Sequence, residues 1–509
     1  MLLGIDFGTT RTVVTAVNRG NYPVVSFTNE AGDAFEWYPS IIATKGAEIA
    51  FGFEALAKQG QPGWTFRRSV KRELATLGPD SRLKIGEHEM SVFEWITSFL
   101  EQLHHDLREN SNLRVKKKDK LEAIISVPAN ANSNQRFITL EAFRRAGFDV
   151  RGMMNEPSAA GIEYAHHILG ENGVGKREYL LVYDLGGGTF DSAVISLADR
   201  DHEVLSNEGI TRLGGDNFDV ILLDMALKKA DIHEVNDAQL ALLLEECREK
   251  KEGLRPTTRK IAIDLGCAIE GAGEVSLTTT DLYAECKPLI DSTVAAMEQA
   301  MQKATAEAGI DWKSLAAVYL VGGSSDFPPV ARLLRERYSK QVKRSAYPHA
   351  AVAIGLAIAA DTDAGHKLRE RFTRHFGVWR EVESGRHIAF DTLFEKDTLL
   401  PSKGEEKLTL KRRYIPAHNI GHFRYLECGG LDAQRQPQGD ITIWDEIHFP
   451  FDPALRAEES LDGVPISRVT LNGHLIEETY SCDANGIIEV EITDLSDHFS
   501  RSFKLRGKK

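Results

Sequence analysis

Leu3-Gly-Ile-Asp6-Phe-Gly8-Thr9-Thr10 is an apolar strand pattern that ends in an aspartate, followed by a turn of glycine and hydroxyl residues. A variant of the same sequence stands near residue 180, as Leu181-Val-Tyr-Asp184-Leu-Gly186-Gly187-Gly188-Thr189-Phe-Asp191. A second β-rich run follows each copy, over residues 12–17 and 192–197. The repeat predicts two pseudo-symmetric lobes, each with a strand, a glycine turn and a returning strand.

The two turns have the composition of a phosphate-binding site. Glycine lets backbone N–H groups come close to an anion, and such turns form concave cradles. An aspartate directly before each cradle suits a magnesium ion that stays largely hydrated on the phosphates. Two unrelated hairpins would explain either copy alone, but the pair favours two lobes that hold one nucleoside triphosphate from both sides.

Composition and charge limit the classes of partner. The 509 residues carry a net charge of −13, which argues against nucleic acid as the main partner. The five cysteines are scattered without a CxxC pair, which favours a reducing compartment over a disulfide framework or a zinc site. The N-terminus enters a strand at once, so no signal peptide is expected. Because the longest apolar stretch, Ala350–Ala360, is too short for a membrane span, we expect a soluble, cytoplasmic protein without a membrane partner.

The pattern of the sequence changes once along the chain. Up to about residue 360, strand-like and helix-like runs alternate as in α/β domains, and residues 216–253 read as almost continuous helix. The polar segment Asp361–Lys367 predicts a linker. Beyond residue 374, alternation as in Ile488–Thr493 and the turn Asn485-Gly486 predict an all-β module. The expected domains are 1–362 and 374–509, joined by a linker at 363–373, with strands at 2–7, 12–17, 123–127, 179–184, 191–197 and 317–321 and amphipathic helices at 91–109 and 134–146.

Further motifs accompany the two cradles in a fixed order. They are Lys71 in Phe66–Arg72, Asn155-Glu156-Pro157, Leu213-Gly214-Gly215-Asp216, Tyr319-Leu-Val-Gly322-Gly323-Ser324, Tyr347-Pro-His349 and, in the β module, Ser481-Cys-Asp483-Ala-Asn-Gly486. In order and wording the chain resembles the DnaK-type heat-shock chaperone family, within the actin-like ATPase superfamily. The resemblance covers residues 2–360 strongly and about 376–500 weakly. It implies a two-lobed, actin-like α/β ATPase domain with a duplicated ribonuclease-H-like fold, followed by a smaller β-sandwich that binds substrate.

The resemblance assigns a role to each matching residue. Asp6 and Asp184, with Glu156, would hold hydrated Mg²⁺ against the phosphates of ATP or ADP, and K⁺ is an optional second ion. Lys71 would lie at the γ-phosphate, orient the attacking water and offset developing charge. Thr189 and Asp191 complete the catalytic set that the resemblance implies. The residues expected to bind the phosphates or the nucleoside are Gly8, Thr9, Thr10, Arg11, Gly186, Gly187, Gly188, Gly214, Gly215, Asp216, Lys251, Gly322, Gly323 and Ser324.

Some of these residues have simpler explanations. Lys71 stands in a run of arginines and could be surface charge. Glu156, beside Pro157, could be only a helix-start carboxylate. The pairs His104-His105 and His166-His167 have no third ligand at a useful spacing, so we expect solvated side chains there rather than a metal site.

The sequence departs from the family in its base pocket. Where the family stacks adenine between two arginines, this chain has Glu252 and Asp326, and His349 replaces an acidic residue near the ribose. A guanidinium stacks on an aromatic face and a carboxylate does not. Weak and poorly selective binding of adenine is therefore expected, although Lys251 still matches the family pattern.

Further departures concern the C-terminal part. The segment Asp361–Leu368 contains one leucine, whereas the family's linker is acidic and leucine-rich, so weak coupling between the domains is expected. The chain stops at Lys509, soon after the β motif, so no helical lid is expected. The aromatic and acidic segment Trp444–Phe451 has no family counterpart, and it is a candidate binding segment for one folded partner.

The leading hypothesis is a chaperone-like protein whose slow, Mg²⁺-dependent ATP hydrolysis switches its binding of unfolded or extended polypeptides. The alternative is an accessory chaperone or adaptor that binds nucleotide without hydrolysing it and engages one specific protein partner or co-chaperone. The intact residues Asp6, Lys71, Thr189 and Asp184 favour the first hypothesis. The changed base pocket, the changed linker and the expected lack of a lid favour the second. A sugar or metabolite kinase of the superfamily is disfavoured, because such lobes seldom carry a C-terminal β-sandwich.

Overall fold

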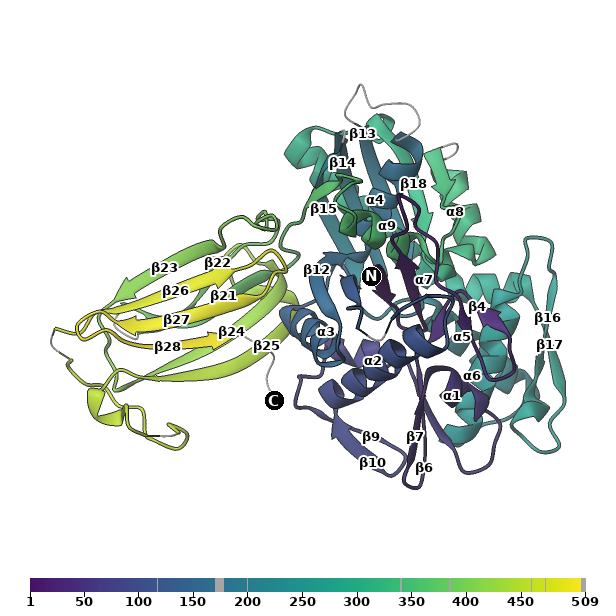
Figure 1. The fold of residues 1–509 in the computed structure, drawn as a ribbon, viewed down its shortest axis with the longest axis horizontal. Helices are drawn as coiled ribbons and strands as arrows, with labels where there is room; N and C mark the ends of the chain where they lie inside the picture. The colour runs from purple at the N-terminus through teal and green to yellow at the C-terminus, as the bar shows by residue number, and fades with distance from the viewer. Residues whose placement is uncertain are drawn as a thin grey trace. The chain divides into compact units, whose positions relative to one another are not determined.

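The computed structural model describes residues 1–116, 118–169, 178–198, 200–338, 341–383, 386–458, 460–471 and 473–504. These residues form two compact units. Unit 1 comprises Met1–Ala75, Arg82–Asn130 and Thr139–Leu368, and unit 2 comprises Thr76–Ser81, Ala131–Ile138 and the chain from Arg369 onward. Figure 1 shows unit 1 as a mixture of helices and sheets, and the C-terminal part of unit 2 as sheet.

The first lobe of unit 1 is built on a five-stranded sheet in the order β12-β11-β1-β2-β5. Strand β1 pairs antiparallel with β2 and parallel with β11, so the first glycine turn joins two neighbouring strands inside the sheet. Apolar side chains such as Leu3, Ile5 and Val14 are fully buried in these strands. The strands are β1 (Leu2–Phe7), β2 (Arg11–Ala16), β5 (Tyr38–Pro39), β11 (Glu122–Val127) and β12 (Asp149–Asn155).

The second lobe repeats this arrangement in a six-stranded sheet, in the order β19-β18-β13-β14-β15-β20. Strand β13 pairs antiparallel with β14 and parallel with β18, as β1 does with β2 and β11. The two-lobed α/β fold predicted from the sequence repeat is therefore confirmed. The strands are β13 (Glu178–Leu185), β14 (Phe190–Ala198), β15 (Asp201–Ile210), β18 (Leu315–Val321), β19 (Val342–Arg344) and β20 (Lys367–Arg369).

Two helices connect the lobes by packing on each other. Helix α9 contacts β1, β2 and β11 of the first lobe, α4 contacts β13 and β14 of the second, and the two helices touch. Gly355 allows this close approach, since a Cβ there would lie 1.8 Å from the carbonyl oxygen of Ala159. The helices are α1 (Gly52–Ala57), α2 (Val92–Glu109), α3 (Ser133–Arg145), α4 (Glu156–Tyr164), α5 (Gly215–Ala230), α6 (Asp237–Glu252), α7 (Thr279–Ala308), α8 (Pro328–Tyr338) and α9 (Ala351–Ala360).

The prediction of an almost continuous helix over residues 216–253 is wrong. The chain forms α5 and α6 instead, and Asp231 ends α5 in a left-handed conformation with φ 56°. Asn236 then caps α6, because its side chain accepts a hydrogen bond from the amide of Gln239. The prediction rested on the composition of the run and overlooked these two end signals.

Short elements complete unit 1, in a three-stranded sheet β7-β6-β8 and the ribbons β3-β4, β9-β10 and β16-β17. In the ranges that the structure describes, no helix is both long and apolar enough to cross a bilayer. The short elements are β3 (Phe27–Thr28), β4 (Ala34–Phe35), β6 (Ile41–Lys45), β7 (Glu48–Phe51), β8 (Thr65–Arg68), β9 (Arg82–Ile85), β10 (His88–Ser91), β16 (Lys260–Asp264), β17 (Glu274–Thr278) and the single turns η1 (Val70–Ala75), η2 (Ala165–Leu169), η3 (Leu265–Cys267), η4 (Trp312–Ser314) and η5 (Gly323–Asp326).

The C-terminal part of unit 2 contains two four-stranded antiparallel sheets, β22-β21-β24-β25 and β23-β26-β27-β28. Both sheets contribute to one apolar core, with Phe376, Tyr425 and Trp444 from the first and Tyr480 and Val490 from the second. The predicted β-sandwich is therefore confirmed. Its elements are β21 (His375–Val382), β22 (His387–Phe394), β23 (Leu408–Tyr414), β24 (Ile420–Leu431), β25 (Pro437–Pro450), the turn η8 (Pro453–Leu455), β26 (Ile476–Cys482), β27 (Ile488–Asp494) and β28 (Phe499–Lys504).

The aromatic side chains of the segment Trp444–Phe451 belong to this core, whereas Glu446 between them is exposed. Trp444 is 1% exposed, and Phe449 and Phe451 are buried with it. The hypothesis that Trp444 contacts a folded partner is therefore wrong, because the indole is already covered by the sandwich itself.

Candidate functional site

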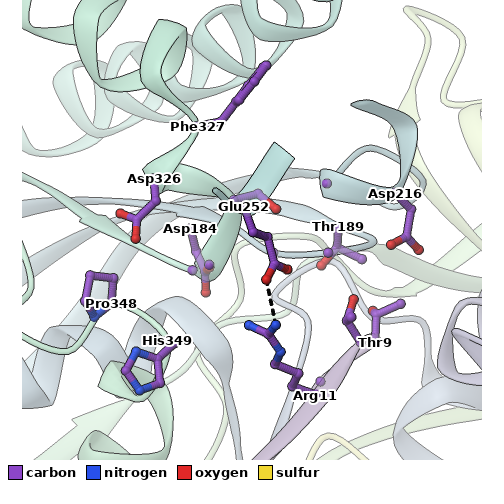
Figure 2. Close-up of a pocket in the computed structure, with 18 of the residues that line it drawn as sticks. Thr9, Arg11, Asp184, Thr189, Asp216, Glu252, Asp326, Phe327, Pro348 and His349 are labelled. Atoms are coloured by element: carbon purple, nitrogen blue, oxygen red, sulfur yellow. Dashed lines mark hydrogen bonds and ion pairs between the residues drawn. The ribbon is translucent and has the colours of Figure 1, made fainter. Parts of the chain in front are cut away.

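A cavity of about 310 Å³ opens between the two lobes of unit 1. Its walls come from the two glycine turns, from helices α5 and α6 and from the turn after β18, and Figure 2 shows these side chains around one space. The structure brings most of the predicted site residues together here. Those that line the cavity are Asp6, Gly8, Thr9, Thr10, Arg11, Lys71, Glu156, Asp184, Gly186, Gly187, Thr189, Gly215, Asp216, Lys251, Gly322, Gly323 and Ser324.

Gly188 and Gly214 pack directly behind this lining. A Cβ at Gly188 would lie 2.8 Å from Thr9 Oγ1, and a Cβ at Gly214 would lie 2.5 Å from the carbonyl oxygen of Gly187. Each glycine therefore lets one turn approach another at a distance that a larger residue would forbid.

Carboxyl groups from both lobes meet at one side of the cavity. Asp6 is the last residue but one of β1, and Asp184 has the same position in β13. Glu156 opens α4. Asp191, which completes the predicted catalytic set, lies behind the lining on β14, opposite Asp184 in the strand register. It is buried and accepts a hydrogen bond from the backbone amide of Asn130 at 3.3 Å.

Both simpler explanations for Lys71 and Glu156 are wrong. Lys71 is 7% exposed, so it is not surface charge. Glu156 does open a helix, but its Oε1 accepts a hydrogen bond from Lys71 Nζ at 2.8 Å inside the cavity wall. Lys71 therefore lies among the acids Asp6, Glu156, Asp184 and Asp191, which we call the acidic cluster.

Asp6, Asp184 and Asp191 have pKa values above the ordinary value of an aspartate. Burial, and then the charge of Glu156, raise the pKa of Asp6 to about 6 and that of Asp191 to about 7. The same two causes, followed by Asp191 and Asp6, raise the pKa of Asp184 well above its ordinary value. Lys71 lowers each of these values but does not cancel the repulsion.

This excess of buried negative charge fits a divalent cation. Mg²⁺ prefers oxygen ligands, keeps several waters and is typically held by a few carboxylates and by the phosphates of a bound substrate. Asp6, Glu156 and Asp184 are the carboxylates of the lining that raise one another's pKa or take part in that repulsion, and a bound ion would relieve it.

The glycine turns pack closely together in the wall of the cavity. Thr10 Oγ1 is buried without a hydrogen-bond partner, and a Cβ at Gly187 would lie 2.1 Å from it. Gly322 has φ +82°, and a Cβ there would lie 2.4 Å from Asp184 Oδ1. Neither position can take another residue without closing the space. An unpartnered hydroxyl beside backbone turns is the kind of donor that a phosphate group would satisfy.

The part of the cavity expected to hold the base is lined by ion pairs. Arg11 Nη2 lies 2.7 Å from Glu252 Oε2, the contact drawn as a dashed line in Figure 2. The Arg11 guanidinium also lies 4.6 Å from the centre of the Trp37 ring. Asp326 pairs with Arg344. Arg11 was predicted to bind the nucleotide, and it does line the cavity, but its charge is engaged by Glu252 and Trp37.

Lys251 is held in place by two contacts. Its Nζ donates to the carbonyl oxygen of Gly215 at 2.7 Å and lies 2.6 Å from Asp219 Oδ1. Asp216 accepts a hydrogen bond from the hydroxyl of Ser69 at 2.8 Å. These contacts fix the start of α5, which carries the Gly214-Gly215 turn, against α6.

Sequence reasoning missed several residues of the lining, among them Trp37, Arg248 and Arg255. Arg248 could have been found, because it precedes Lys251 by three positions on one helix and shares its face. Trp37 and Arg255 stand in connecting segments, where no periodicity places a side chain.

Known proteins resemble this chain over most of its length. The family model described as Hsp70 protein matches residues 82–373. The chaperone protein DnaK of Thermotoga petrophila is 29% identical over 528 aligned positions, which cover 100% of this chain and 80% of that protein. The chaperone protein DnaK of Halobacterium salinarum is 28% identical over 519 positions, which cover 99% of this chain and 75% of that protein.

Proposed function

Because the chain belongs to the Hsp70 family, we propose that unit 1 binds a magnesium–nucleoside triphosphate in the cavity between its lobes and hydrolyses it slowly. Members of this family are ATPases. The observation that carries the proposal is the convergence of both glycine turns on one buried cluster of acids around Lys71. Phosphoryl transfer depends mainly on positioning and on neutralisation of charge, which this set of residues can supply.

Each part of the cluster has a distinct task in this proposal. Bound Mg²⁺ would neutralise charge on the phosphate oxygens, and Asp6, Glu156 and Asp184 would hold it. The two glycine turns, which line the cavity with Thr9 and Thr10, would hold the phosphates. Lys71, fixed by Glu156, would orient the attacking water and offset charge that develops on the γ-phosphate.

The β-sandwich is proposed to bind unfolded or extended polypeptide, with hydrolysis in unit 1 as the switch. A sandwich can hold an extended segment through backbone hydrogen bonds and alternating side-chain pockets. An array of peptides probed with the full chain tests this binding. If the chain binds none of the peptides, the proposal is contradicted. The need for a co-chaperone and the cytoplasmic location both stay predictions.

The second candidate is an accessory chaperone or adaptor that binds nucleotide without hydrolysing it. The ion pair Arg11–Glu252 favours it, because this pair occupies the place where a stacking arginine was expected. Single-turnover hydrolysis of labelled ATP, with Mg²⁺ or with a chelator and with or without unfolded polypeptide, separates the two. Magnesium-dependent product formation supports the ATPase; nucleotide binding with no product supports the adaptor.

A further inference from the structure

Three histidines that are far apart in the sequence meet in unit 1, and we call them the imidazole row. His202 Nε2 lies 2.9 Å from His366 Nδ1, and His366 Nε2 lies 3.4 Å from His166 Nδ1. The rings of His202 and His366 are stacked, and His166 meets His366 edge to face. The expectation of solvated side chains is therefore wrong for His166, whereas its neighbour His167 is exposed.

The row connects three elements of unit 1. His202 lies in β15, His166 lies in η2 after α4, and His366 lies in the segment Asp361–Leu368, which we call the joining segment because unit 2 follows it. The amide of Lys367 donates to the carbonyl oxygen of Arg200 at 2.7 Å, and β20 is the neighbour of β15 in the sheet. Beside this backbone pairing, the joining segment contacts the second lobe through His366, which meets His202, and through Leu368, which packs on the apolar core.

The hydrogen bonds of the row require neutral rings. His202 is fully buried, and its Nδ1 has no partner. A buried lone pair without a donor is tolerated better than a buried N–H without an acceptor, so the proton of His202 belongs on Nε2. His202 then donates to His366 Nδ1, and His366 donates from Nε2 toward His166. A second proton on His366 would set two N–H groups against each other at 2.9 Å.

The surroundings of the row also oppose a positive charge. Burial, then His202, His166 and Arg200, lower the pKa of His366 to about 4, and burial lowers that of His202 to about 4. Burial, His167 and Arg200 lower the pKa of His166. The charged or titratable groups that face the row are Arg200 just before β15, Asp201 at its start, His167 from η2, Asp361 from the joining segment and Tyr22. Tyr22 packs on His166 and donates to Asp361 at 3.0 Å.

We propose that the imidazole row is a pH-sensitive clasp, which holds the joining segment on β15 at neutral pH and releases it on acidification. The geometry supports this directly, since the row is complete only when His366 is neutral and placed between His202 and His166.

The sign and size of the effect follow from proton linkage. The pKa of a released His366 returns to about 6.5, above its value of about 4 in the row. Attachment is then complete above pH 6.5 and weakens as the pH falls from 6.5 toward 4. One such group makes attachment about tenfold weaker at pH 5.5 than at pH 7.5.

Hydrogen exchange of the full chain in the presence of a metal chelator tests the proposal. The readout is the protection of the Lys367 amide, corrected for the intrinsic pH dependence of exchange. We expect protection to fall about tenfold between pH 7.5 and pH 5.5, while amides in the middle of β15 keep theirs. Unchanged protection of Lys367, or an equal loss throughout β15, would overturn the proposal.

Two variants give the matched comparison. His366→Asn should abolish the pH dependence, with the Lys367 amide either protected or unprotected at both pH values. His167→Asn removes an exposed imidazole on the neighbouring turn and should leave the pH dependence as in the parent chain. If the tenfold change persists in His366→Asn, another group titrates and the proposal is wrong.

Discussion

Lys71 and Glu156 form a buried ion pair, with 2.8 Å between Nζ and Oε1, although 85 positions separate them in the sequence. Separating such a pair leaves an uncompensated charge in a medium of low polarity, so the pair resists rearrangement. Lys71 comes from the short turn η1 and Glu156 from the start of α4, so the contact also ties a peripheral segment to the centre of unit 1. The ammonium group is thereby held beside Asp6 and Asp184.

We expect Lys71→Ala to keep nucleotide binding and to lose hydrolysis, because the phosphates retain both glycine turns but the water loses its orienting group. Stability should fall by about 3–5 kcal/mol, since Glu156 stays buried without its partner. The double variant Lys71→Ala, Glu156→Gln is the control: its stability should recover and its turnover should not. Loss of nucleotide binding in both, seen by calorimetry, would make Lys71 a phosphate anchor instead.

The ion pairs of the base pocket predict weak and unselective binding of the base. Stacking on an arginine is worth about 1–2 kcal/mol per face, so its absence costs roughly ten- to a hundredfold in affinity. The variant Arg11→Asn, Glu252→Arg, Asp326→Arg should tighten ATP binding by that factor. The same variant with lysines at 252 and 326 adds equal charge without a flat stacking group and should gain less.

Calorimetry with ATP and GTP on the unmodified chain measures how strongly the base pocket prefers adenine to guanine. We expect the two dissociation constants to differ by about tenfold or less, since Glu252 and Asp326 are engaged by Arg11 and Arg344. Strong preference for ATP would mean that another side chain, with Trp37 the first candidate, covers the base.

The acidic cluster predicts a proton release when the metal binds. Burial and the charge of Glu156 raise the pKa of Asp6 to about 6 and of Asp191 to about 7, so in the metal-free site both groups are largely protonated at pH 5.5. Mg²⁺ needs ionised carboxylates. The affinity for Mg²⁺–nucleotide should therefore rise between pH 5.5 and pH 8, and calorimetry in buffers of different ionisation enthalpy should detect released protons at pH 6.5.

The raised pKa values of Asp6 and Asp191 also determine how the stability of the metal-free protein depends on pH. An acid whose pKa is higher in the folded state stabilises the fold below its ordinary value of 3.8 and loses that contribution as the pH rises through 6 to 7. Asp191→Asn removes one titrating group and should reduce both the proton release and this loss. Proton release equal to that of the parent chain would show that other groups titrate.

Trp444→Ala should unfold the sandwich rather than report on a partner. The indole is fully buried with Phe376 and Tyr425, so its removal should lower the free energy of unfolding of unit 2 by about 3–5 kcal/mol. Denaturant unfolding followed by circular dichroism measures this. Ile443→Ala is the control, because Ile443 lies on the same strand but is exposed and should change stability little. A stable Trp444→Ala chain would contradict the burial argument.

The sequence alone was sufficient for the parts of the site that local motifs encode. Asp6 and Asp184 each end a strand directly before a glycine turn, and a turn of this composition has few alternative conformations. The repeat then required the two turns to be equivalent, and the paired sheets of unit 1 bear this out.

Contacts between distant residues could not be predicted in this way. Arg11 and Glu252 are 241 positions apart, and His202 and His366 are 164 apart. Each pair depends on how the lobes and the joining segment fold together. Trp444 was misread for the same reason, since an unfamiliar aromatic run has the same composition whether it faces solvent or a core.

Asp184→Asn in a single-turnover assay with Mg²⁺ and labelled ATP tests the central claim most directly. Asp184 is buried among the acids at the cavity and lies beside the Gly322 turn. An asparagine there has nearly the same shape, so the substitution removes the charge and little else. We predict at least about a hundredfold loss of the hydrolysis rate, since such charge stabilisation is worth several kcal/mol. Glu234→Gln, at an exposed loop position, is the control and should turn over like the parent chain. Unchanged hydrolysis in Asp184→Asn would contradict the account.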